Sequence, residues 1–440
     1  MEEIGTVDRR QFIRLAGLAG AAAGMSGVLT SCKSSGKSSG GSSGRTIKLG
    51  YVTPKTGSLA PFGEADDYVL SAMQDSFKGG LQIGGKSYPI QIVPKDTQSD
   101  ANRAATVAGD LINTDKVDVV LVSSTPETTN PVSGQCEANG VPCISTVAPW
   151  QPWFLGQQKD PANPKPFQWA YHFFWGLEDI EAVFLDMWGQ VGNNKTIAGL
   201  FPNDGDGNAW GDKKLGFPSF FDPKGYKLID PGRYQDQNDD FSSQIAKYKA
   251  GKAEILTGVP IPPDFTNFWK QAAQQGFRPK IASVGKALLF PSSIEALGDI
   301  GIGLSSEVWW SPSHPFKSSL TGATAKALTD DFTAKTGKQW TQPIGFAHAL
   351  FEVVADALKR SGNPDDRNAI INAIKSTNLD TIVGKIQWTG KPFPNVAKTP
   401  LVGGQWVKGT GKYPYDLVIV SNSDHPEIPK AGTLAAIGSA

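Results

Sequence analysis

The sequence predicts an α/β fold made of doubly wound parallel sheets. Short runs rich in β-branched residues alternate with helical segments along most of the chain, in two successive series. Such an alternation favours parallel sheets that carry helices on their faces. The chain has 440 residues, which is long enough for two cores of ordinary domain size. We therefore expect two α/β units.

Two neighbouring strands of the first series end in loops that suit ligand binding. The apolar run Val117–Val122 predicts a buried strand, and the hydroxyl-rich segment 123–129 follows it. A helical segment is expected from Asn130, and Asn139-Gly140 ends it as residues typical of helix C-termini. The next strand, Val141–Thr146, leads into loop 147–150. Because ligands bind at the carboxyl ends of strands in open α/β sheets, we expect both loops to border a binding cleft.

The rest of the chain supplies further strands and helices in the same alternation. Asp100 or Ser99 is expected to cap the helix at 101–113, since both side chains accept hydrogen bonds from backbone N–H groups. The expected strands are 46–52, 90–95, 196–201, 226–229, 254–258, 280–284, 384–388, 405–407 and 415–421. Residues 168–174 are expected to form a strand or a crossover, and residues 304–310 an extended segment that crosses back. The expected helices are 64–77, 101–113, 177–190, 211–221, 240–249, 263–275, 287–297, 323–336, 343–361 and 364–375.

Composition excludes some classes of partner. Lysine plus arginine residues equal aspartate plus glutamate residues, at 42 each, so the charge balance gives no support for a nucleic-acid partner. The four histidines are scattered without a zinc-binding spacing. Asp204-x-Asp206-x-Asn208 begins like a calcium loop but has Ala209 and Leu215 where such a loop needs glycine and an acidic residue, which favours a turn. We expect neither a metal nor a cofactor.

The first 45 residues are predicted to comprise a targeting signal and a linker, and not to belong to the fold. Residues 1–32 resemble a twin-arginine export signal that ends in a lipobox, with Arg9-Arg10 ahead of a weakly apolar run and Cys32 as the lipidated residue. Two acyl chains suffice for stable anchoring. Residues 33–45 are rich in serine and glycine and predict a flexible linker. We expect an exported lipoprotein held on the outer face of the cell membrane.

Two further cysteines, Cys136 and Cys143, lie in or next to a predicted helix and strand of the first series. Outside the cytoplasm they can form a disulfide. Two buried thiols are the alternative, because free cysteine is often buried. The sequence leaves both possibilities open.

Several segments together resemble a known family. They are the Pro54-x-Thr56-Gly57-x-x-Ala60-x-x-Gly63 loop, the stretch 101–146 with its LINTDKVDVVL and NGVPCIS segments, and the DFSSQIA segment that begins at Asp240. The chain resembles the substrate-binding proteins of ABC importers of the branched-chain amino acid type, which have the type I periplasmic binding fold.

The resemblance implies two lobes joined by three chain crossings, one formed by residues 46–171 and 309–383 and the other by residues 172–308 and 384–430. The lobes close on a small ligand as a hinge does. The resemblance also implies a permease and an ATPase as partners, a monomer, and no enzymatic activity.

The resemblance further implies which residues contact the ligand. In the family, hydroxyl and backbone N–H groups of the two strand-end loops hold the ligand, and aromatic side chains cover it. The corresponding or neighbouring candidates here are Phe62, Ser124, Thr125, Thr128, Thr146, Ala148, Trp150, Trp175 and Trp210.

One departure from the family bears on the ligand. Amino-acid binders have an acidic residue after the strand that corresponds to 280–284, whereas this chain has Gly285-Lys286. An ammonium group on the ligand would then meet a like charge. We therefore expect a ligand other than a standard α-amino acid, such as a carboxylate or an amide, with its negative end at Lys286. A ligand sensor on the same fold and an exported hydrolase are the alternative functions.

Overall fold

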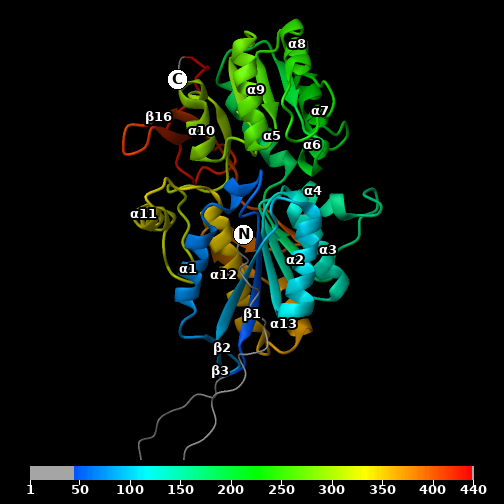
Figure 1. Ribbon diagram of the computed structural model, residues 1–440, viewed down its shortest axis with the longest axis vertical. Coiled ribbons are helices and arrows are strands. Elements are labelled where there is room, and N and C mark those ends of the chain that lie inside the picture. The colour runs from blue at the N-terminus through cyan, green and yellow to red at the C-terminus, as the bar shows by residue number, and fades with distance from the viewer. Residues whose placement is uncertain (1–43, 439–440) are drawn as a thin grey trace, which may run out of the picture. The chain divides into compact units, whose positions relative to one another are not determined.

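The computed structural model describes residues 44–438, which form two lobes. Each lobe has a mostly parallel sheet that is covered by helices (Figure 1). This architecture confirms the α/β fold predicted from the sequence. No helix among the described residues has the length and apolar character needed to cross a membrane. The export signal at 1–32, the lipidation of Cys32 and most of the linker at 33–45 lie outside the described residues.

The sheet of the first lobe has six strands, all parallel, in the order β4-β1-β5-β6-β7-β15. Its central strands are buried on both faces, which explains their nearly continuous apolar sequences. Its strands are β1 (Ile47–Thr53), β4 (Ile90–Asp96), β5 (Val119–Ser123), β6 (Cys143–Thr146), β7 (Ala170–Phe173) and β15 (Val396–Ala397).

Helices cover both faces of this sheet. Figure 1 shows α2 and α3 together on one side and α1 and α12 on the other. As predicted, Asp100 caps α2 by accepting a hydrogen bond from the backbone N–H of Arg103. As also predicted, Gly140 ends α3 in the left-handed conformation. The helices are α1 (Asp66–Ser76), α2 (Ala101–Asp110), α3 (Pro126–Asn139), α4 (Trp150–Phe154), α11 (Ala325–Thr336), α12 (Pro343–Ser361) and α13 (Arg367–Lys375).

The sheet of the second lobe has seven strands in the order β9-β8-β10-β11-β12-β16-β17. The first five are parallel, and β16 and β17 add an antiparallel edge. The strands are β8 (Thr196–Leu200), β9 (Lys227–Ile229), β10 (Ile255–Gly258), β11 (Ile281–Val284), β12 (Ser305–Val308), β16 (Val402–Lys408) and β17 (Tyr415–Ser421). The helices are α5 (Leu177–Gly189), α6 (Gly205–Trp210), α7 (Phe217–Phe221), α8 (Ser242–Ala250), α9 (Pro262–Gln274) and α10 (Pro291–Leu297).

The chain crosses between the two sheets three times, after β7, β12 and β15. The predicted assignment of 384–430 to the second lobe is wrong at its start. Strand β14 (Gly384–Gln387) pairs with β13 (Asn378–Thr381) beside α12, and β15 then pairs with β7. The apolar pattern of 384–388 indicated a strand but contained no information on its partner. The first crossing also comes slightly later than predicted, because β7 includes His172 and Phe173.

Two other local differences have simple causes. The helix expected to start at Asn130 already starts at Pro126, a position where proline suits the first helical turn. A short hairpin, β2 (Leu81–Ile83) with β3 (Lys86–Tyr88), was not predicted. The sequence left open whether Cys136 and Cys143 form a disulfide or remain two buried thiols. In the structure both are buried free thiols.

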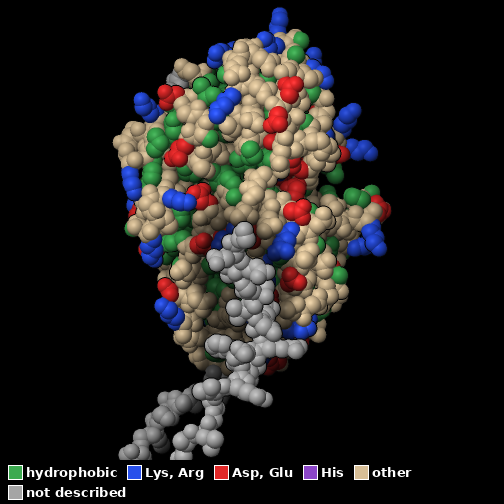
Figure 2. Space-filling model, viewed as in Figure 1, with side chains coloured by type: hydrophobic (Ala, Val, Ile, Leu, Met, Phe, Trp, Pro, Cys, Tyr) green, Lys and Arg blue, Asp and Glu red, His purple; other side chains and the backbone are tan. Residues whose placement is uncertain are grey.

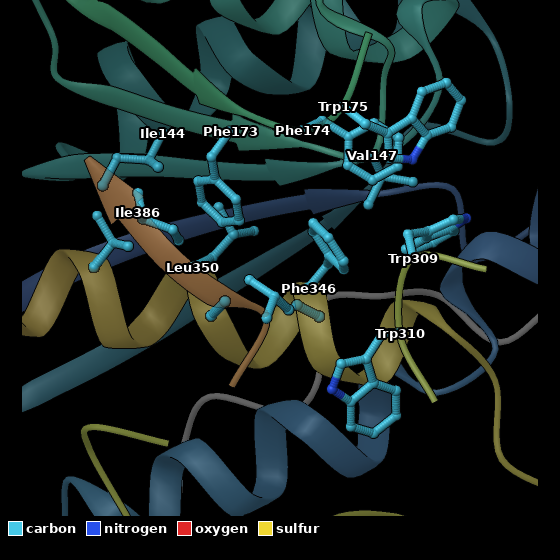
Figure 3. Packing of buried hydrophobic residues seen from close by; sticks show 14 of the residues in the cluster. Ile144, Val147, Phe173, Phe174, Trp175, Trp309, Trp310, Phe346, Leu350 and Ile386 are labelled. Carbon is cyan, nitrogen blue, oxygen red and sulfur yellow. The ribbon is translucent and has the colours of Figure 1, made fainter. Parts of the chain in front are cut away.

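A continuous apolar core extends from the first lobe to the chain crossings. Figure 3 shows Phe346 and Leu350 of α12 beneath Phe173 and Phe174. The ring centroids of Phe174, Trp309 and Phe346 lie 5.0–5.2 Å apart, in edge-to-face contacts. The crossings are therefore packed against the core of the first lobe. On the face displayed in Figure 2, basic and acidic side chains are interspersed.

Candidate functional site

A small cavity lies between the two lobes and takes its walls from both. Its volume is about 20 Å³, room for little more than ordered water. A larger ligand therefore requires the lobes to be further apart than they are in this structure. The residues that line it are Phe62, Thr125, Val147, Pro149, Phe174, Trp175, Asp206, Trp210, Val259, Lys286, Leu289, Glu307 and Trp309.

Strand order brings these residues together. In the first lobe, the segments that follow β1, β5, β6 and β7 supply the lining side chains. In the second lobe, the lining comes from the end of β12 and from segments that follow β8, β10 and β11. All these strands are parallel within their own sheet, so their carboxyl ends meet at one edge. This is the edge at which open α/β sheets bind ligands.

The wall from the first lobe and the first crossing is apolar and aromatic. Figure 3 shows Val147, Phe174 and Trp175 close together, with Trp309 of the second crossing beside them. Phe62 meets Phe290 of the second lobe edge-on, with ring centroids 4.9 Å apart. Aromatic walls bind flat or rounded apolar groups with few directional contacts.

The wall from the second lobe is charged. The ammonium Nζ of Lys286 lies 2.6 Å from Asp204 Oδ2 and 2.9 Å from Asp206 Oδ2. Glu127 of the first lobe reaches across the cleft, with its Oε2 3.8 Å from the same Nζ. Its Oε1 accepts a hydrogen bond of 2.7 Å from the backbone N–H of Gly205, at the start of α6. Glu127 therefore links the two lobes.

Burial shifts the pKa values of these groups. Burial raises the pKa of Asp206 to about 6, against the opposing attraction of Lys286. Burial also raises the pKa of Glu307 to about 7. The pKa of Asp204 is likewise raised by burial, and nearby Glu127 and Asp206 add to the shift. Burial alone would lower the pKa of Lys286, but Asp204, Asp206 and Glu127 outweigh it and raise that pKa.

Two lining residues have a backbone conformation that side chains disfavour. Val147 has φ 71° and Lys286 has φ 58°, both in the left-handed region. This conformation is rare for residues other than glycine, asparagine and aspartate, and it is unusual for a β-branched residue. Next to Lys286, a Cβ on Gly285 would lie 2.6 Å from the Trp210 ring, so only glycine fits there. Strain of this kind gathers at functional sites.

Five of the residues predicted to contact the ligand line the cavity. They are Phe62, Thr125, Trp175, Trp210 and Lys286. Lys286 lies in the cleft as expected, but its charge is already held by Asp204 and Asp206. The basis for a negative ligand end at Lys286 is therefore weakened.

The other five predicted residues do not line the cavity. Thr128 donates its hydroxyl to Ser124, and Thr146 donates to the carbonyl of Phe173, so these hydroxyls are bonded within the first lobe. The carbonyl of Ala148 pairs with Nε2 of His172. The indole of Trp150 donates to Glu178 near the first crossing.

Sequence reasoning missed the acidic part of the site. Asp206 belongs to the segment predicted to be a turn. That segment is instead helix α6, and Asp204 is its N-cap, accepting from the backbone N–H of Gly207. Glu307 is the one charged residue in the strand 304–310, and a lone carboxylate in a buried strand was the available signal. Val147, Pro149, Val259 and Leu289 gave no comparable signal.

Glu127, Asp204 and Asp206 could together hold a metal ion, because one carboxylate oxygen from each lies within 4.8 Å of the others. The ammonium of Lys286 lies among these oxygens. A metal ion would therefore have to displace a lysine that is itself a cation. The cluster is best described as a cation site that the chain fills with its own side chain.

A profile of the family described as periplasmic binding protein matches residues 46–410. The chain belongs to the periplasmic binding protein family. The resemblance predicted from the sequence motifs is thereby confirmed. Proteins of this family bind substrates outside the cytoplasm for ABC transporters and are in general not enzymes.

Solved structures with the same fold bind chemically different ligands. A leucine-binding protein, LivK, from Thermotoga maritima is 19% identical over 86% of this chain and 100% of that one, with a TM-score of 0.68. LivJ from Streptococcus pneumoniae, in complex with isoleucine, is 18% identical over 85% of this chain and 99% of that one, with a TM-score of 0.66. A solute-binding protein from Rhodopseudomonas palustris, in complex with 3,4-dihydroxybenzoic acid, is 19% identical over 86% of this chain and 96% of that one, with a TM-score of 0.67.

Proposed function

We propose that this protein is the extracytoplasmic solute-binding component of an ABC importer. It binds one small ligand between its lobes and delivers it to a membrane permease that an ATPase drives. The observation that carries the proposal is the cavity lined from both lobes at the carboxyl ends of their strands. The family to which the chain belongs supports this role.

Lobe closure is the step that the protein contributes. The lobes touch through Phe62 and Phe290 and through Glu127 and Gly205. A ligand that contacts both walls favours the closed arrangement, because it interacts with that arrangement better than with the open one. The closed protein is the form that docks to the permease. The predicted lipid anchor on Cys32 would hold the protein near that permease.

A hydrolase is less well supported. Among the described residues, serine–histidine pairs occur at Ser145 with His172, Ser311 with His314, and Ser318 with His348. All three histidines are buried, and none of the three pairs lines the cavity between the lobes. In the last pair, the nearest carboxylate approaches the same Nε2 that meets the serine, which differs from a catalytic triad.

The experiment joins ligand binding to transport. The protein is unfolded and refolded to remove any retained ligand, and then screened for thermal stabilisation by small amines, carboxylates, amides and amino acids. A ligand at 100 times its Kd stabilises the folded state by about 2.7 kcal/mol. Deleting the protein from its host should abolish high-affinity uptake of that ligand.

A pair of variants connects the uptake to the cavity. Trp175→Ala removes a lining side chain and should weaken both binding and uptake. Trp169→Ala, which lies outside the cavity, is the control. Uptake that persists unchanged in the deletion strain would contradict the importer role.

A further inference from the structure

Negative charge exceeds positive charge around the cavity. Carboxylates of Glu127, Asp204 and Asp206 surround the single ammonium of Lys286. Glu307 adds a fourth carboxylate, with its Oε1 accepting a hydrogen bond of 3.2 Å from the backbone N–H of Lys286. Among the described residues, Lys286 is the only cation that forms an ion pair with any of these four. A bound cation would reduce this imbalance.

Asp206, which lines the cavity, has a carboxylate oxygen without a hydrogen-bond partner. Asp206 uses Oδ2 for Lys286, whereas its Oδ1 is buried without a hydrogen-bond partner. A buried acceptor without a partner costs free energy that a donor on a ligand can recover. Burial is the main cause of the raised pKa values of Asp206 and Glu307, and neighbouring carboxylates add to both shifts.

The aromatic side chains complete a surface suited to an organic cation. Phe62, Phe174, Trp175, Trp210 and Trp309 all line the cavity. Aromatic faces attract cations, and several of them together recognise alkylated ammonium groups. Each cation–π contact found in residues 44–438 involves an aromatic residue other than these five. A cation of the protein therefore does not occupy these faces.

The indole N–H groups point to a second feature of the ligand. Nε1 of Trp175, of Trp210 and of Trp309 is buried without a hydrogen-bond partner. Three unpartnered donors around one cavity suit an oxygen acceptor on the ligand. A simple hydrocarbon cation would leave them unbonded.

We propose that the cleft binds a small ligand with an alkylated ammonium group and an oxygen acceptor, the ammonium lying between the aromatic walls and the carboxylates of Asp206 and Glu307. The inference rests on the proposed function and names its substrate class. It replaces the expectation of an anionic ligand, because Lys286 is already paired with two carboxylates. It also differs from recognition of a metal ion, because phenylalanine and tryptophan side chains are not metal ligands.

The test compares ligands of equal shape and different charge on the refolded full chain. Choline carries the ammonium and a hydroxyl, and 3,3-dimethylbutan-1-ol is its uncharged counterpart. Ethanolamine keeps the charge but lacks the methyl groups. We expect choline or glycine betaine to bind at least about tenfold more tightly than the neutral alcohol, and choline more tightly than ethanolamine.

Variants assign the effect to the cavity. Asp206→Asn should weaken choline binding by about tenfold or more, and Trp309→Leu by a similar factor. Asp212→Asn is the matched control. Asp212 lies on an exposed turn just after helix α6, which carries Asp206, and its substitution should leave the Kd unchanged. Circular dichroism confirms that each variant is folded.

The outcomes separate this inference from the importer role. Equal binding of choline and its neutral counterpart, or no binding of either, overturns the cationic class. Closure of the lobes around isoleucine, 3,4-dihydroxybenzoate or calcium alone also overturns it but leaves solute binding intact. Choline binding without any uptake defect in the deletion strain supports the ligand class and contradicts the importer.

Discussion

The two walls of the cleft differ in the charge that they carry. The first lobe presents Phe62, Val147 and Trp175 on loops whose buried hydroxyls are largely bonded to their own lobe. The second lobe presents a lysine enclosed by carboxylates. The first wall carries no ionised side chain among its lining residues, whereas the second holds charge that burial penalises. Under the proposed function, we expect the second lobe to select the charge of the ligand and the first lobe to select its shape.

The largest expected effect comes from removing the one ammonium of the charged wall. Lys286→Met leaves Asp204 and Asp206 buried without a counter-charge and should lower the free energy of unfolding by about 3–5 kcal/mol at pH 8. The loss should shrink toward pH 5, because burial raises the pKa of Asp206 to about 6 and that carboxylate takes up a proton as the pH falls. Urea denaturation at the two pH values measures it.

Lys280→Met is the matched control for Lys286→Met. Lys280 pairs with Glu254 at 3.0 Å in the same lobe, but its side chain is 48% exposed. Its removal should cost less than about 1 kcal/mol. A similar loss in the free energy of unfolding for the two variants would contradict the stronger ion pairing that we infer for the buried Lys286.

Glu181 is a buried acidic residue outside the cleft, and it can be compared with the buried carboxylates of the second wall. Glu181 on α5 is 1% exposed, and neither carboxylate oxygen has a partner. Burial raises the pKa of Glu181 to about 9, with nearby Glu178 and Asp179 contributing. Above the unfolded-state pKa of about 4.3 the unfolded chain loses this proton while the folded one keeps it, so stability falls as pH rises toward 9.

Glu181→Gln should therefore raise the free energy of unfolding by about 1–3 kcal/mol at pH 7–8, and by less at pH 5. Thermal unfolding across this pH range checks the sign. Glu178→Gln is the contrasting variant, because Lys398 holds the pKa of Glu178 below its usual value against the effect of burial. That substitution should destabilise the protein, and a gain there would contradict the assignment.

Two threonines test whether the first wall divides as the structure indicates. Thr128→Val removes a buried hydrogen bond of 2.7 Å to Ser124 and should cost about 1 kcal/mol of stability, with ligand affinity unchanged. Thr125→Val alters a lining residue and should lower affinity. Isothermal titration gives the ligand affinity of each variant, and denaturation gives its free energy of unfolding. Equal affinity losses would place Thr128 in the site after all.

The smallest expected effect concerns the contact between the walls. Glu127→Ala removes the hydrogen bond to Gly205 and the charge beside Lys286, so it should shift the ligand-free protein toward the open arrangement. We expect a change of about 1 kcal/mol or less, visible as a larger radius of gyration in solution scattering. Glu137→Ala is the control, since Glu137 lies on the same helix but bonds backbone groups of the first lobe.

The sequence by itself determined the features that depend on a few neighbouring residues. The strand–helix alternation, the cap at Asp100 and the end of α3 at Gly140 follow from local patterns. The family also followed, because its motifs are short and their order is kept along the chain. The resemblance also indicated Phe62 and Trp210, and both line the cavity between the lobes.

Only the tertiary structure decided which charges meet. Glu127, Asp204, Lys286 and Glu307 come from four separate strand–loop segments, and the strand order of two sheets and their contact bring them together. A lysine beside a cleft and a lysine enclosed by carboxylates look the same in sequence, because Coulomb attraction depends on distance in space. The same reason explains strand β14: its apolar pattern specifies a strand, whereas its partner depends on where α12 lies.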